Sequence, residues 1–161
     1  MDGRIKTVVL LGFMTALMLG IGRLLGGFKG LTIGLVLALV MNIGMYWFSD
    51  KIVLAMYRAK PFTQKDQPEL YQLVKEVVEK SHLPIPKLYI IPSASPNAFA
   101  TGRNPNHAAV AFTGGILTLL NKDELRGVIA HELAHVKNRD ILITTIAATI
   151  AAVISYVGMI V

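Results

Sequence analysis

The chain has 161 residues, of which 53% are hydrophobic and only 16% charged, and its mean hydropathy is +0.55; this balance excludes an ordinary water-soluble enzyme and indicates an integral membrane protein. The net charge of +6 does not point to nucleic acid, because the basic residues form no aromatic-interleaved patch and several of them flank apolar runs. Cysteine is absent, which excludes disulfides and a thiol nucleophile and leaves histidine and carboxylate side chains as ligands for any metal.

Two apolar runs predict a transmembrane helical hairpin over residues 1–49, with spans at about 7–25 and 31–48. A cleaved signal peptide is the alternative for the first run, but no small-residue cleavage site leads from that run into a polar domain. The glycines in both runs are equally compatible with close helix contact and with weak helix. Tyr46 and Trp47 suit the membrane interface at the end of the second span.

More basic residues flank the two ends of this hairpin than lie in its loop. Arg4 and Lys6 precede the first span and a cluster of cations at 51–65 follows the second, whereas the loop contains Arg23 and Lys29. The positive-inside rule therefore predicts that both ends of the hairpin face the cytoplasm.

The pattern of residues 50–140 predicts an α/β domain at the cytoplasmic membrane surface. Asp66 and Glu69 have capping-box spacing at the start of a helix, with Asp66 as the cap. His82 ends this helix, where a helix-terminal histidine is more common than a metal ligand. The apolar positions that form the helix's buried stripe are Leu70, Leu73, Val74, Val77 and Val78.

Two extended runs at 87–91 and 108–112 predict strands, and the stretch between them, rich in Asn, Pro and Gly, predicts a loop. An exposed strand edge beside a catalytic helix can hold a peptide substrate extended through main-chain hydrogen bonds. The alternative is that these strands are only the core of a small sheet. His107, just before the second strand, is expected to face solvent.

The sequence His131-Glu132-Leu133-Ala134-His135 carries the chemistry of the chain. Positions i and i+4 share a helix face, so the two histidines can point both imidazoles at a single ion. Glu132 then lies beside the open coordination position, where a carboxylate acts as general base. The polar cap at Asn121, the carboxylates after it and the apolar stripe predict that this segment is a helix. The spacing is that of zinc peptidases; a structural zinc site usually has four ligands, several of them cysteine.

Asp140, just beyond this helix, has two interpretations. It is either an acceptor that orients a ligand imidazole or a helix-end charge paired with Arg139. Residues 141–161 carry no charge and predict a third transmembrane helix, which places the histidines close to the membrane surface.

The stretch Ser-Pro-Asn-Ala-Phe-Ala-Thr-Gly at 95–102 and the extended helix sequence at 123–140 resemble the HtpX family of membrane-bound zinc metallopeptidases. The order of the other elements is also similar along essentially the whole chain. The resemblance implies an α+β membrane protein, in which a small zincin-like α/β catalytic domain lies between the transmembrane hairpin and a third transmembrane helix at the C-terminus.

The resemblance further implies a metalloendopeptidase of the cell inner membrane that hydrolyses peptide bonds of damaged or misfolded membrane proteins under stress. His131 and His135 would hold one Zn2+ per chain. Glu132 would take a proton from the zinc-bound water and return it to the leaving amine. The loop containing Asn97, Ala98 and Phe99 would lie near the cleft and bind substrate. Protein substrates and the lipid bilayer are the expected partners.

In this family a glutamate on a later helix supplies the third zinc ligand, and it is expected beyond Val161. The chain is therefore expected to be an N-terminal portion of such an enzyme. The alternative function is a catalytically inactive membrane module that lacks the third ligand.

Overall fold

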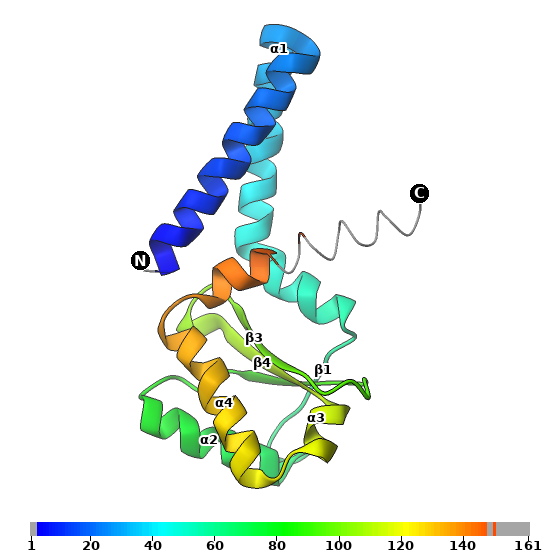
Figure 1. Cartoon of the computed structure of the whole chain (residues 1–161), viewed down its shortest axis with the longest axis vertical. Helices are drawn as coiled ribbons and strands as arrows, with labels where there is room; N and C mark the ends of the chain where they lie inside the picture. The colour runs from blue at the N-terminus through cyan, green and yellow to red at the C-terminus, as the bar shows by residue number, and fades with distance from the viewer. Residues whose placement is uncertain (1–2, 148–149, 151–161) are drawn as a thin grey trace.

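A computed structural model describes residues 3–147 and 150 of the chain. Residues 141–147 are helical, and they lie near the lower ends of the long helix α1 in Figure 1. The other elements are α1 (Gly3–Met56), β1 (Lys60–Pro61), α2 (Pro68–Ser81), β2 (Lys87–Ile91), β3 (Ala98–Gly102), the short 3-10 helix η1 (Pro105–His107), β4 (Ala108–Thr113), α3 (Gly114–Leu119) and α4 (Lys122–Lys137).

The apolar helix α1 is interrupted at Gly26 and Gly27, and its two arms run side by side away from the sheet (Figure 1). Gly27 has a φ of 59°, which glycine adopts at little cost. The arms touch through their backbones, because a Cβ on Gly22 would collide with the carbonyl oxygen of Gly30. Across the same interface, Asn42 Nδ2 donates a hydrogen bond to Thr15 Oγ1 at 2.8 Å. A glycine contact and a polar pair therefore set the register of the two arms.

The second arm of α1 continues past the expected end at Phe48 as far as Met56. Its last turns keep a helical apolar pattern in which Val53 and Leu54 are buried. Leu54 packs against Ile91 of β2 and against alanines of β4. The end of α1 therefore covers one face of the sheet.

The four-stranded sheet has the order β1-β2-β4-β3. Strands β2 and β4 are parallel, while β1 and β3 pair with them in the antiparallel sense. Residues 98–102 are therefore an edge strand, and the prediction of a loop here was wrong. Three of the five residues are alanine or glycine, whose intrinsic strand signal is weak, and the pairing of Ala98 with Phe112 through Gly102 with Ala108 makes the strand.

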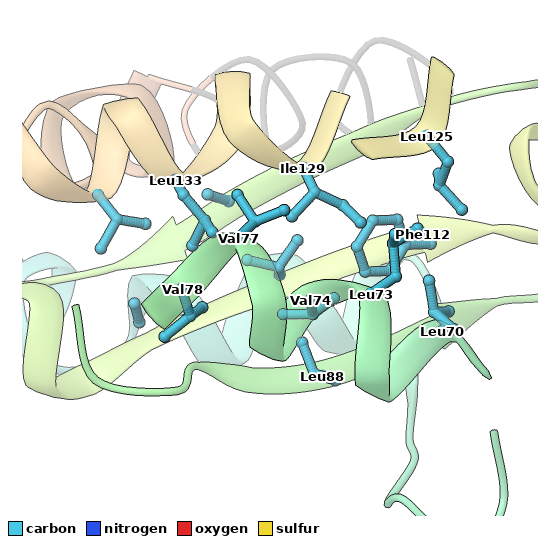
Figure 2. Close-up of a cluster of buried hydrophobic side chains, with 14 of the residues drawn as sticks. Leu70, Leu73, Val74, Val77, Val78, Leu88, Phe112, Leu125, Ile129 and Leu133 are labelled. Carbon is cyan, nitrogen blue, oxygen red and sulfur yellow. The ribbon is translucent and has the colours of Figure 1, made fainter. Parts of the chain in front are cut away.

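The main hydrophobic core lies between the other face of the sheet and helices α2 and α4 (Figure 2). Ile129 and Leu133 of α4 point toward Val74 and Val77 of α2. Phe112 of β4 belongs to the same buried cluster. All five apolar positions predicted for α2 are buried, which confirms the predicted stripe. This packing holds α4 firmly, with its opposite face left open.

The predicted cap of α2 was wrong. The helix begins at Pro68, and its N-cap residue Gln67 makes no side-chain cap hydrogen bond. Instead Asp66 accepts hydrogen bonds from the backbone nitrogen and the hydroxyl of Thr63, at 2.8 and 2.7 Å. An aspartate side chain can accept hydrogen bonds from nearby donors in a turn as well as at a helix end, and here Asp66 makes its hydrogen bonds within the turn.

Candidate metal centre

Helix α4 starts at the polar cap that the sequence predicted, Asn121, which also forms a complete capping box with Glu124. The Asn121 side chain accepts hydrogen bonds from the backbone nitrogens of Asp123 and Glu124, both at 3.0 Å, and the Glu124 carboxylate accepts one from the Asn121 backbone at 2.9 Å. These bonds satisfy helix-end donors and fix where the helix begins. The residues that α4 buries are Leu125, Ile129, Leu133 and Val136.

His131 and His135 lie on the face of α4 that is not used for this packing, His131 exposed and His135 half-buried. Their Nε2 atoms are 3.3 Å apart, and the two rings are nearly perpendicular, at 87°. Two nitrogen ligands at about 2.0 to 2.1 Å from a tetrahedral zinc ion are themselves about 3.3 to 3.4 Å apart. The pair therefore fits two corners of a zinc site.

Glu132 is held between α4 and the edge strand. Its Oε2 accepts a hydrogen bond from the backbone N–H of Ala100 at 3.0 Å, and its side chain is half-buried. Glu132 therefore follows His131 directly in the sequence, but its carboxylate is directed to the free edge of β3. Ala100 was not predicted as a site residue, and its only signal in the sequence is its position inside the 95–102 stretch.

A cavity of about 280 Å³ opens beside Glu132 and His135. Asn97, Ala98 and Phe99 line it, so these three residues and two of the α4 residues are brought together. No sequence pattern indicated the remaining wall, which comes from distant segments. Those wall residues include Val53 of α1, Tyr57 just after it, and Thr144 and Thr145 of the helix at 141–147.

Among the described residues, the Asp140 carboxylate pairs with neither a ligand imidazole nor Arg139. Its Oδ1 accepts a hydrogen bond from Lys6 Nζ at 3.3 Å, and its backbone nitrogen donates to the His135 carbonyl at 3.1 Å. This ion pair joins the start of α1 to the end of α4. In the part of the chain that the structure describes, no group of three or more His, Asp or Glu side chains is arranged to hold a metal.

The other two histidines are placed as the sequence suggested. His82 is the C-cap of α2 in the left-handed conformation, with a φ of 56°. His107 is exposed, and its Nδ1 lies 2.8 Å from Asn104 Oδ1. Both therefore have local roles in chain turns, which makes His107 a useful control for the pair on α4.

Comparisons with known proteins show what the chain is similar to. The model of peptidase family M48 matches residues 64–161. A protease HtpX homolog of Syntrophobacter fumaroxidans is 57% identical over 154 residues, which cover 96% of this chain and 55% of that protein. The homolog of Desulfatibacillum aliphaticivorans is 56% identical over 158 residues, or 98% of this chain and 51% of that protein. The chain thus spans about half the length of the curated relatives it matches.

Proposed function

The chain belongs to peptidase family M48, and from this premise we propose that it acts as a zinc metalloendopeptidase through His131, Glu132 and His135. The observation that carries the proposal is the 3.3 Å separation of the two imidazole nitrogens, with the next side chain, Glu132, held at a strand edge. Two neutral imidazoles and a nearby carboxylate that is not a ligand are the parts that a zinc peptidase needs on its helix.

Each protein group has a defined task in this proposal. His131 and His135 would hold the ion through Nε2, and zinc would supply Lewis acidity toward a water molecule and a peptide carbonyl. Glu132 accepts the proton of the attacking water on a carboxylate oxygen and delivers it to the leaving amine. General base catalysis of this kind contributes about 10² to 10⁴ in rate.

The free edge of β3 is proposed to hold the substrate. The Asn97 carbonyl oxygen accepts a hydrogen bond from the Thr113 backbone N–H at 2.9 Å. Because backbone groups along an antiparallel strand point alternately toward and away from the paired strand, those of Ala98 and Ala100 point away from β4. The bond from Ala100 N–H to Glu132 supports this direction. A peptide added as a further strand would run past the carboxylate and the histidines, which favours a substrate strand over a purely structural role for this edge.

Helix α1 is proposed to anchor the site in the membrane. Among the described residues, the segment Ile5–Met56 is long and apolar enough to cross a bilayer, with a mean hydropathy of 2.1 in its most apolar window. Leu24 and Leu25, near the turn between the arms, are 86% and 85% exposed, which suits contact with lipid. At about 1.5 Å per residue, each arm is long enough to span a core of about 30 Å.

The orientation and the substrates are part of the same proposal. Both arms of α1 would cross the cell inner membrane, residues 50–140 would lie in the cytoplasm, and damaged membrane proteins would be the substrates. The start of α1 lies next to the α/β domain, as its Lys6–Asp140 ion pair requires, and this supports a common side for both ends of the hairpin. Most of the third predicted span, 141–161, lies outside the described residues.

The test is a comparison of the wild-type chain with Glu132→Gln, purified in detergent and loaded with zinc. We expect the variant to keep one zinc per chain and to lose casein cleavage by a factor of about 10² to 10⁴. His107→Ala, which changes an exposed histidine, is the matched control and should retain both properties. Cleavage that survives Glu132→Gln would remove the role given to this carboxylate.

A second candidate function is a catalytically inactive membrane module. The observation in its favour is that the described residues place two histidines together on α4 but contain no group of three or more side chains that could hold a metal. This function predicts substoichiometric zinc and no casein cleavage in the wild-type chain. Metal analysis of the same preparation therefore distinguishes it from the peptidase.

A further inference from the structure

Two hollows flank Glu132 at the free edge of β3. One is the cavity of about 280 Å³ between β3 and the end of α1. The other is a more open hollow between β3, α3 and the first half of α4, and it borders His131. Glu132, Asn97 and Ala98 line both of them, so the two hollows adjoin at the strand edge.

The first hollow lies on the α1 side of the sheet. Phe99 packs with Leu54 of α1 in the smaller core cluster, and its ring lies 5.3 Å from the Tyr57 ring. Tyr57 is half exposed, at 49%, whereas Val53 beside it is buried. The Tyr57 ring, packed beside Phe99, is therefore a solvent-exposed part of the cavity wall.

The second hollow lies on the opposite side of the sheet edge, where Ile116 and Leu120 line it together with Gly127 of α4. Glycine inside a helix is destabilising relative to alanine. No packing requires it here, because a Cβ on Gly127 would meet nothing within 4 Å. The missing side chain leaves space one helical turn before His131, on the same stripe of α4.

A strand that extends a sheet points successive side chains to opposite faces. We propose that Tyr57 and Gly127 set the size limits for two neighbouring side chains of an extended, apolar peptide bound to the edge of β3. Tyr57 acts on the side chain facing α1, and Gly127 acts on the next one, facing α3 and α4. This inference rests on the proposed peptidase function and assigns α1 a second role, as a wall of the substrate site.

Binding is tested by photo-cross-linking to the zinc-loaded Glu132→Gln chain in detergent. The probe is a lysine-flanked decapeptide of alternating threonine and alanine, with benzoylphenylalanine placed at each position in turn. We expect that moving the benzophenone by one residue switches the labelled positions between Tyr57 or Phe99 and Ile116 or Leu120. Labelling that does not alternate, or that misses both hollows, would overturn the inference.

Size selection is tested with the same peptide bearing phenylalanine or alanine at the position that labels each hollow. Tyr57→Ala should raise the phenylalanine-to-alanine affinity ratio by about tenfold, while Tyr57→Phe, which keeps the ring, should leave it unchanged. Gly127→Ala should raise the melting temperature and lower the ratio at the other position by about tenfold. A higher melting temperature with an unchanged ratio would show that Gly127 has no role in selection.

These outcomes separate the inference from the function beneath it. Casein cleavage that depends on Glu132, without alternating labels, would support the peptidase function and contradict the inference about the two side-chain positions. Alternating labels without zinc or cleavage would support the peptide site and remove the catalytic proposal.

Discussion

Oε2 of Glu132 lies 3.0 Å from the backbone nitrogen of Ala100. The proposed general base is therefore hydrogen-bonded to β3, the strand that is proposed to hold the substrate. Glu132→Asp keeps the charge but shortens the side chain by one methylene, which takes the carboxylate out of reach of this N–H. Misplacement of a catalytic group by about 1 Å can cost about 10²-fold in rate, and we expect a fall in kcat of this size. Zinc content and KM should change little.

Steady-state kinetics on casein-derived peptides and metal analysis of the same samples measure this effect. A kcat equal to that of the wild-type chain would show that contact with Ala100 does not position the carboxylate.

Among the described residues, the two histidines of α4 are the predicted zinc ligands. Loss of either imidazole leaves one ligand on the helix, so His131→Ala and His135→Ala should each abolish stoichiometric zinc. The helix itself should survive, because its cap at Asn121 and its buried face are untouched. Zinc analysis and far-UV circular dichroism measure the two properties, with His107→Ala as the control. Full zinc occupancy in either α4 variant would contradict the assignment.

The zinc helix was predictable because every signal for it is local. A cap, carboxylates in the first turn, an apolar stripe and an i, i+4 histidine pair all occur within α4 and agree with one another. Strand β3 was not predictable in the same way, because its pairing partner β4 and its contact with Glu132 come from elsewhere in the chain. Tyr57 is a still clearer case, since only the fold brings the end of α1 to the wall of the cavity.

The hydrogen bonds in the turn before α2 predict a pH-dependent contribution of Asp66 to the stability of the fold. The hydroxyl and then the backbone N–H of Thr63 donate to Asp66 and lower the pKa of that carboxyl below its ordinary value. Thr63→Val should raise the pKa back toward that value, whereas Thr63→Ser should keep it low. Because the folded pKa is the lower one, the stabilisation is complete above the unfolded pKa, about 3.9, and is lost as the pH falls through the folded pKa.

A side-chain carboxyl NMR titration of the three proteins measures this pKa directly. An equal pKa in the wild type and in Thr63→Val would show that the hydroxyl bond does not form in solution.

The glycine contact inside α1 predicts opposite effects for two similar substitutions. Gly22→Ala places a methyl group against the carbonyl of Gly30, so the arms must separate or shift, at a cost of about 1 to 3 kcal/mol. Gly20→Ala adds the same group where nothing lies within 4 Å, and it should be neutral or stabilising by up to about 1 kcal/mol, because alanine is the better helix former. Thermal unfolding in one detergent, followed by circular dichroism, compares the two variants with the wild type. If Gly22→Ala melts at or above the temperature of Gly20→Ala, the arms do not make backbone contact at this position.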